Sequence, residues 1–587
     1  MDMRQLLLGC LLFLTTVLAD TDPLVIKGTK FFHSSNGTQF YAKGILYDEF
    51  TGAKAGLSEV DFLSIRSACE RDIPIFQQLS LNAVGLYTVD AYADHDYCIG
   101  LLRDAGIYVV VFLNAVNAAS TDVDDPSWNT DEFAEKIAIV DALAGYDNVM
   151  AFMVYEDLSA ADAGYSKAKV RDIKAYIAAR EYRAIPVGYG MWLNPSSEEN
   201  LFFTCGSEDE SADFFALQTN NWCGTTLEEN QWDLYLDHFN NYSAPVIMAE
   251  YGCTGNEAGV TPGLEVGLLY GDDMAEVFSG GLLYTYAGGS YGLVNVSNQE
   301  VDKGTQFSRY SSQFAHASPT SINSDSYTPT NTASSDCPTD FAASSNLPPA
   351  PDDQFCECTL QNSLCAPDTD ISDDDLDALF TSICDESADL CTLHTSNATL
   401  GIYGMYSMCN GTVEAAALLS NFTQQERGDA QNYCTQVWTS AVTTNADYQP
   451  TGTCTTMPIS DRYEPTGEAG TGSSESGGAG DSSSGSGLGA GAIAGIVVGA
   501  VAGIAIIAMG IFFIRRKTKA TASAGVGAGS ELVEPVELPP GKHYDKSELP
   551  AGPIEPVELE GERPELDSSG GSDREPVELP GEGRRET

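Results

Sequence analysis

Basic residues are scarce in this chain of 587 residues. Its 29 Lys and Arg stand against 84 Asp and Glu, which gives a formal net charge of −55. A protein that binds nucleic acid neutralises phosphates with Lys and Arg, so this balance excludes a nucleic-acid partner. It is typical of a solvated surface that faces neutral partners.

Motifs for metal ions and dinucleotides are also missing. The chain has only six His, and Cys356-Glu-Cys358 is a C-x-C rather than a paired C-x2-C set, which argues against a zinc site. No G-x-G-x-x-G follows the first predicted strand, so a dinucleotide-binding fold loses support. We therefore expect neither a metal nor a cofactor.

Cysteine, in contrast, is plentiful, and the N-terminus indicates why. Arg4 precedes an apolar run from Leu6 to Leu18, and Ala19 ends a small-residue cleavage site, which together predict a secretory signal peptide. One of the fifteen cysteines, Cys10, leaves with this peptide, and an even fourteen remain. In a secreted chain they predict seven disulfides.

Composition divides the chain into seven predicted segments. A 27-residue stretch without charge is followed at once by Arg515-Arg-Lys-Thr-Lys519, which is typical of a spanning helix with its basic end in the cytoplasm. The tail beyond it is acidic, rich in Pro and predicted to be disordered, and it repeats Glu-Pro-Val-Glu-Leu at Glu534, Glu555 and Glu575, a candidate docking motif for a cytosolic partner. The segments are a signal peptide (1–19), a catalytic domain (20–317), a linker rich in Ser, Thr and Pro (318–354), a cysteine-rich module (355–458), a Gly/Ser-rich spacer (459–487), the transmembrane helix (488–514) and the tail (515–587).

The catalytic domain alternates apolar runs with amphipathic stretches. Eight such β units within about 270 residues predict a closed (β/α)8 barrel, and an open doubly wound sheet is the alternative. The predicted strands are Gln39–Tyr47, Leu81–Val89, Gly106–Asn114, Val149–Asp157, Ala184–Gly190, Ala212–Asn220, Ala244–Gly252 and Gly280–Gly288. Helical spacing marks Phe62–Leu79, Asp131–Leu143, Ser166–Ala179 and Leu264–Phe278, and in the module Asp373–Leu379 and Val413–Leu419.

Two glutamates end two of these strands. Glu250 closes the run Pro245-Val-Ile-Met-Ala-Glu-Tyr-Gly-Cys253, and Glu156 closes Val149-Met-Ala-Phe-Met-Val-Tyr-Glu156. Barrel enzymes keep their chemistry at the carboxyl ends of their strands. A carboxylate there can also be merely solvated or salt-bridged, but two of them suggest paired-carboxylate chemistry.

The chain resembles the fungal glycoside hydrolase family 72, the β-1,3-glucanosyltransferases of the cell wall. The resemblance covers about Pro23 to Val296 and is carried in order by Lys30-Phe-Phe-His-Ser-Ser-Asn-Gly-Thr-Gln-Phe-Tyr-Ala-Lys-Gly44, Cys69-Glu-Arg-Asp-Ile-Pro74, Asp124-Asp-Pro-Ser-Trp128, Glu250-Tyr-Gly-Cys253 and Ser279-Gly-Gly-Leu-Leu-Tyr284. The cysteine-rich part resembles a family 43 carbohydrate-binding module through Leu347-Pro-Pro349, Cys356-x-Cys358 and Gly401-x-Tyr-Gly-x-Tyr-Ser-x-Cys409.

This resemblance implies a retaining enzyme that cuts β-1,3-glucan and transfers the fragment to a second glucan chain. Glu250 would be the nucleophile and stay ionised, and Glu156 would be the acid/base and hold a proton through a raised pKa. Tyr155 stands where the family has an Asn that binds the sugar 2-hydroxyl, and Gly85 stands where it has an Arg. Candidate substrate-binding residues are Tyr87, Tyr155, Tyr251, Tyr284 and Tyr291, each of which can instead be a packing aromatic of the barrel rim.

The resemblance also implies the disulfides Cys69–Cys98, Cys223–Cys253 and, from the barrel domain to the linker, Cys205–Cys337, whereas the eight module cysteines allow 105 pairings. Six Asn-x-Ser/Thr sites are candidates for glycosylation: Asn36, Asn241, Asn295, Asn397, Asn410 and Asn421. We expect a plasma-membrane protein whose N-terminal part faces the cell wall. Three alternatives stay open: a catalytically impaired glucan-binding wall protein, a membrane-tethered wall sensor and an endo-β-1,3-glucanase.

Overall fold

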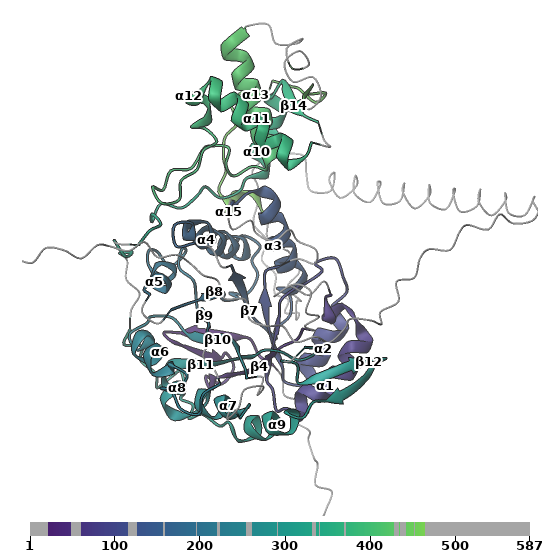
Figure 1. The fold of residues 1–587 in the computed structure, drawn as a ribbon, viewed down its shortest axis with the longest axis vertical. Helices are drawn as coiled ribbons and strands as arrows, with labels where there is room; N and C mark the ends of the chain where they lie inside the picture. Colours follow the sequence, from purple (N-terminus) through teal and green to yellow (C-terminus); the bar gives the residue numbers. More distant parts are fainter. Residues whose placement is uncertain are drawn as a thin grey trace, which may run out of the picture. The chain divides into compact units, whose positions relative to one another are not determined.

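Eight parallel strands close into a barrel in the computed structural model (Figure 1), which confirms the predicted fold class. The structure describes residues 21–463 apart from 49–59, 115–125, 157–158, 195–196, 220–222, 254–260, 290, 332–335, 340, 369–370, 428–433, 435–441 and 451. The barrel strands in chain order are β4 (Ala42–Leu46), β5 (Ala83–Leu86), β6 (Tyr108–Phe112), β7 (Val149–Tyr155), β8 (Val187–Trp192), β9 (Phe215–Gln218), β10 (Val246–Tyr251) and β11 (Phe278–Leu283).

Helices cover the outside of the barrel. They are α1 (Arg66–Gln78), α2 (Asp96–Asp104), α3 (Thr130–Leu143), α4 (Ala163–Ala179), α5 (Glu199–Thr204), α6 (Trp232–Phe239), α7 (Leu264–Leu269), α8 (Asp272–Val277) and α9 (Phe307–His316), with a short 3-10 helix, η1, at Phe62–Ser64. The prediction of one helix over Leu264–Phe278 is wrong. Gly271 is extended, with φ −72° and ψ 162°, so α7 and α8 are separate, and Phe278 already belongs to β11.

The alternation of strand side chains builds two apolar cores. Residues such as Ala216, Ile247 and Phe112 fill the inside of the barrel, and residues such as Val246 and Leu217 pack between strands and helices. Because successive strand residues point to opposite faces, a strand's parity decides whether its last residue faces the barrel axis or the helices. This alternation therefore decides which residues at the strand ends can take part in a site at the barrel mouth.

The predicted first strand is two strands rather than one. Gln39–Phe40 forms β3, which pairs with an antiparallel hairpin of β1 (Leu24–Lys27) and β2 (Lys30–His33), and the barrel strand β4 begins only at Ala42. A second hairpin, of β12 (Val294–Ser297) and β13 (Glu300–Lys303), follows the barrel. The short strand β3 therefore belongs to the N-terminal sheet and leads directly into the barrel strand β4.

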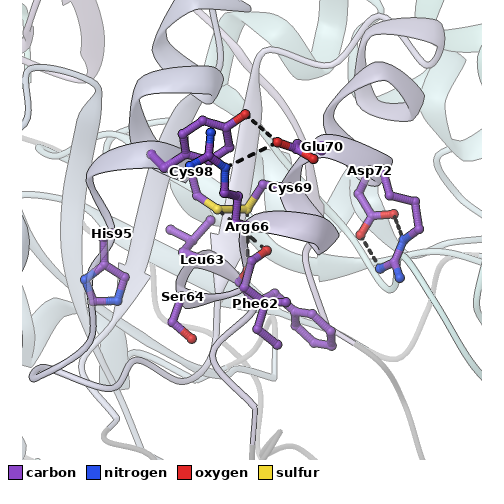
Figure 2. The surroundings of a disulfide bond; sticks show 12 residues. Phe62, Leu63, Ser64, Arg66, Cys69, Glu70, Asp72, His95 and Cys98 are labelled. Carbon is purple, nitrogen blue, oxygen red and sulfur yellow. Dashed lines mark hydrogen bonds and ion pairs between the residues drawn. A yellow bond between two sulfur atoms is a disulfide. The ribbon is translucent and has the colours of Figure 1, made fainter. Parts of the chain in front are cut away.

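A disulfide between Cys69 of α1 and Cys98 of α2 ties the first two helices together (Figure 2). On the same helix, Asp72 is fully buried and accepts hydrogen bonds from the hydroxyls of Tyr47 (2.8 Å) and Tyr286 (2.6 Å). Tyr47 and Tyr286 follow β4 and β11, so this one carboxylate fixes α1 to the ends of two barrel strands.

The cysteine-rich module is mostly helical. It contains α10 (Asp353–Asn362), β14 (Cys365–Pro367), α11 (Asp373–Glu386), α12 (Ala388–Cys391), α13 (Gly411–Arg427), β15 (Val442–Thr444) and α15 (Ile459–Arg462). Its four disulfides, which the sequence left open, are Cys356–Cys409, Cys358–Cys454, Cys365–Cys434 and Cys384–Cys391. With Cys69–Cys98 and Cys223–Cys253 in the barrel domain and Cys205–Cys337 between it and the linker, the prediction of seven disulfides is confirmed.

No helix within the described ranges is long and apolar enough to span a bilayer. The predicted signal peptide, the transmembrane helix at 488–514 and the tail at 515–587 all lie outside those ranges.

Removal of the Cys69–Cys98 bond should destabilise the barrel. The bond closes a loop between positions 29 residues apart, and loop entropy of that size corresponds to about 3–4 kcal/mol. We expect a Cys69→Ala/Cys98→Ala variant to lower the free energy of unfolding by that amount in denaturant titrations. An unfolding free energy within about 1 kcal/mol of the parent would show that the bond does not constrain the unfolded chain.

Candidate active site

A bulge in β10 turns Glu250 toward the barrel axis. Ile247 and Ala249 face the inside, Met248 faces the helices, and the register with β9 shifts between Met248 and Glu250. A bulge of this kind re-aims the side chain that follows it. Consecutive strand residues normally face opposite sides, but the bulge makes Ala249 and Glu250 both point inward.

Three side chains hold the Glu250 carboxylate. The hydroxyl of Tyr87 donates to Oε1, the hydroxyl of Tyr155 lies 3.1 Å from the same oxygen, and the amide of Gln218 donates to Oε2 at 3.1 Å. Tyr155 also lies 2.5 Å from Oε1 of Gln218. Donors from β7, β9 and the end of β5 thus fix the carboxylate in one orientation.

Burial raises the pKa of Glu250, because a carboxylate loses its hydration at a site where only 8 % of the residue is exposed. The hydrogen bonds from Tyr87, Tyr155 and Gln218 act in the opposite direction but do not cancel this effect on its pKa. A Cβ at Gly85 would lie 2.7 Å from side-chain atoms of both Leu282 and Leu46, so a larger residue there would require these leucines to shift.

Glu156 is turned toward the helices instead. In β7, Met153 faces the inside, Val154 the helices and Tyr155 the inside, and no register shift interrupts this part of the strand. The carboxylate of Glu156 accepts hydrogen bonds from Lys169 (2.7 Å) and Ser166 (3.0 Å), which both belong to α4. Lys136 of α3 lies 3.9 Å away.

These contacts reverse the expected order of acidity. Burial raises the pKa of Glu156, but the positive charges of Lys169 and Lys136 and the hydrogen bonds from Lys169 and Ser166 outweigh it, so the pKa lies below its usual value. The directions of both pKa shifts are opposite to those expected for a protonated Glu156 and an ionised Glu250. In the structure Glu250 is the weaker acid of the two.

Four of the five predicted substrate-binding tyrosines lie together near Glu250. Tyr87 and Tyr155 contact Glu250, and Tyr284 packs against the same inner core, where burial and then the charge of Glu250 raise its pKa to about 12. Tyr291 meets Tyr284 edge to face, with ring centroids 5.4 Å apart. All four therefore belong to one aromatic cluster at the barrel mouth.

Tyr251 does not lie with the other predicted substrate-binding tyrosines. It is fully buried in the core between strands and helices, because the bulge that turns Glu250 inward turns the next residue outward. A side chain in that position packs the fold and does not reach a substrate at the barrel mouth.

Gln218 and Lys169 are site residues that the sequence analysis missed. Gln218 lies within the predicted strand Ala212–Asn220, so its place near the carboxyl end of a strand was an available signal. Lys169 had no such signal. It lies on α4, 13 residues after Glu156, and its side chain is fully buried between Glu156 and Glu132, which is 2.8 Å away.

A disulfide closes the rim beside Glu250. Cys253 follows β10 and is bonded to Cys223, which follows β9. Since these two strands carry Glu250 and Gln218, the bond restrains the loops next to the carboxylate. Among the residues that the structure describes, no group of three or more His, Cys, Asp or Glu could hold a metal ion.

Glu250 is thus a buried, hydrogen-bonded carboxylate at the carboxyl ends of the barrel strands, where barrel enzymes carry their active sites. The family model described as "Glucanosyltransferase" matches residues 14–318, and the model of the X8 domain, the family 43 carbohydrate-binding module, matches residues 363–437. The chain belongs to the glucanosyltransferase family, glycoside hydrolase family 72, as the sequence resemblance implied.

Relatives resemble the chain over most of its length. A 1,3-beta-glucanosyltransferase of Arthroderma benhamiae is 35% identical, over 79% of this chain and 89% of the relative. Protein EPD1 of Candida maltosa is 36% identical, over 73% of this chain and 79% of its own length. A solved structure of Saccharomyces cerevisiae Gas2 with laminaritriose and laminaritetraose matches with a TM-score of 0.65 and 27% identity, and covers 73% of this chain and 99% of Gas2.

Replacement of Lys169 by Met should raise activity at the pH optimum. If Glu250 is the nucleophile and Glu156 the acid, retaining chemistry needs Glu250 ionised and Glu156 protonated, and the lowered pKa of Glu156 disfavours that state. Loss of the Lys169 charge raises the pKa of Glu156, so the competent fraction grows about tenfold for each unit by which the two pKa values approach. The acid limb of kcat/KM against pH, which reports the lower pKa, should move to higher pH.

Lys174→Met is the matched control. Lys174 lies on the same helix and forms a 2.7 Å ion pair with Asp213, away from Glu156. This variant should leave the pH profile unchanged. A folded Lys169→Met protein with the parental acid limb would contradict the role assigned to the lysine.

Proposed function

We propose that this chain is a cell-wall β-1,3-glucanosyltransferase, a retaining transglycosylase that cuts β-1,3-glucan and joins the fragment to another glucan chain. The observation that carries the proposal is the inward-turned Glu250, held by Tyr87, Tyr155 and Gln218 at the barrel mouth. Membership of the glucanosyltransferase family and the likeness to a laminarioligosaccharide complex of Gas2 support the substrate class.

In the proposed mechanism, an oxygen of Glu250 attacks the anomeric carbon of a β-1,3-linked glucose, and the glycosidic C–O bond breaks. The departing oxygen takes a proton from Glu156, so the first product leaves as a neutral chain end. A hydroxyl of a second glucan then attacks the glycosyl-enzyme, gives its proton to Glu156 and releases Glu250. The β configuration is kept through two inversions.

Glu156 needs a different partner for these steps than it has at rest. Its carboxylate is bonded to Lys169 and Ser166, so it must exchange at least the Lys169 contact for the glycosidic oxygen. The hydroxyls of Tyr87 and Tyr155 donate to Glu250, and they orient the carboxylate that attacks.

Replacement of Glu250 by Gln should abolish transfer, because an amide cannot form or release the glycosyl ester. We expect a fall of at least about a thousandfold in kcat, consistent with the loss of covalent catalysis. The assay incubates the purified full chain with a reduced-end β-1,3-glucan oligosaccharide and sizes the products. Products longer than the substrate indicate transfer, and only shorter ones indicate an endo-β-1,3-glucanase.

Tyr182→Phe provides a control on the outer surface, since Tyr182 lies in the turn that follows α4 and donates to Asp141. It should retain parental activity. Transfer by Glu250→Gln at the parental rate would contradict the assignment of the nucleophile.

A second candidate function is glucan binding with little turnover. The observation that favours it is the Lys169–Glu156 pair, which keeps the proposed proton donor ionised and turned away from the barrel axis. Binding of the full chain to insoluble β-1,3-glucan without any change in oligosaccharide size would favour this candidate over transfer.

We propose the predicted segment boundaries as the layout of the chain: a signal peptide at 1–19, the catalytic domain at 20–317, the linker at 318–354, the module at 355–458, a spacer at 459–487, a spanning helix at 488–514 and a disordered cytoplasmic tail at 515–587. The uncharged stretch and the basic Arg515–Lys519 support the span. In this layout the barrel and the module face the wall.

Glycosylation fits that placement. Four of the candidate asparagines are exposed, namely Asn36, Asn241, Asn295 and Asn397, whereas Asn410 and Asn421 are half-buried. Asn410 also accepts the first-turn amide of Val413 and donates to Asp131. We propose that the four exposed sites carry glycans.

Deletion of residues 520–587 tests the tail. If Glu-Pro-Val-Glu-Leu docks a cytosolic partner, the deletion should change the cell-surface level or the wall phenotype while transfer by the purified protein stays parental. Scrambled repeats in a tail of the same length and charge serve as the control. Unchanged trafficking and wall phenotype would count against a sensor or docking role.

A further inference from the structure

Trp192 ends β8 at the mouth of the barrel, two strands away from Glu250. The register pairs Trp192 with Gln218 of β9, and Gln218 with Glu250 of β10. These three residues form one row across neighbouring strands. Adjacent strands lie about 4.8 Å apart, so the backbone of Trp192 is roughly 10 Å from that of Glu250.

The parity of β8 directs this tryptophan to the same side as Glu250. Val187, Tyr189 and Met191 all belong to the core between strands and helices, so the residue after Met191 faces the barrel axis. Gln218, its register partner, is bonded to Glu250 and faces the same way.

Trp192 is more exposed to solvent than the aromatic residues that contact Glu250. It is 42 % exposed, whereas Tyr87 is 3 % exposed and serves as a hydrogen-bond donor to Glu250. Gly190, two residues earlier on the same face, makes room for Tyr155, because a Cβ there would lie 2.7 Å from the Tyr155 ring. The ring of Tyr155 therefore lies against β8 just before the exposed indole.

We propose that Trp192 is a sugar-stacking residue that binds a glucose unit next to the one that Glu250 attacks, and so sets the length of glucan that the site holds. A pyranose presents an apolar face of C–H groups, and an exposed indole offers a large, flat, low-entropy surface for it. This inference takes its ligand class, β-1,3-glucan, from the proposed function, but it concerns binding and does not depend on turnover.

Calorimetric titration tests this role in a Glu250→Gln background, so that the ligand stays intact. Laminarihexaose should bind the Trp192→Ala variant about tenfold more weakly than the parent, as expected for the loss of one stacking contact. Laminaribiose, which is too short to reach both positions, should lose less affinity. Trp192→Phe should retain most of the hexaose affinity, which a merely structural role would not require.

Leu234→Ala is the matched control, since Leu234 is 46 % exposed and lies on the outer helix α6. It should bind laminarihexaose like the parent. Equal affinities of the Trp192→Ala variant and its parent, or a parent that does not bind laminarihexaose, would overturn the inference. Hexaose binding that depends on Trp192 in a chain without transfer activity would overturn the proposed function alone.

Discussion

The β-bulge before Glu250 is the constraint on which the site depends. Strand alternation alone would turn Glu250 outward after the inward Ala249, and the register shift cancels that step. The same shift sends Tyr251 into the outer core, where it packs the barrel. β7 has no corresponding shift near its end, so Tyr155 takes the inward position and Glu156 faces the lysines of α3 and α4. One irregular residue in β10 thus turns Glu250 inward, whereas Glu156 stays bonded to the helices.

The inward positions at the strand ends form a connected surface. Glu250, Gln218 and Trp192 lie in one row over β10, β9 and β8, and Tyr155 reaches this row from β7 through its contacts with Gln218 and Glu250. No cation is bonded to Glu250 among the described residues, so hydroxyl and amide donors alone stabilise its charge. In the proposed mechanism, Glu156 has to exchange its contact with Lys169 for the glycosidic oxygen.

Much of this architecture could be predicted from the sequence. Apolar runs such as the one before Glu250 marked all eight strands, and their alternation with helices gave the barrel. The resemblance supplied the three disulfides outside the module, whereas the module pairing, Cys365–Cys434 for example, follows from three-dimensional packing that spacing does not encode. The sequence did not predict that the side chains of Glu156 and Tyr251 point away from the barrel axis, for the same reason. A bulge is a property of two paired strands, and Lys169 becomes a partner of Glu156 only when α4 packs beside β7.

The most direct test of the account is to trap the glycosyl-enzyme. The full chain is incubated with a 2-deoxy-2-fluoro β-1,3-glucosyl donor that carries a good leaving group, and the labelled peptide is identified by mass spectrometry. The account predicts one ester adduct on Glu250, and none in the Glu250→Gln variant. An adduct on any other carboxylate, or active transfer of normal glucan with no adduct on Glu250, would contradict it.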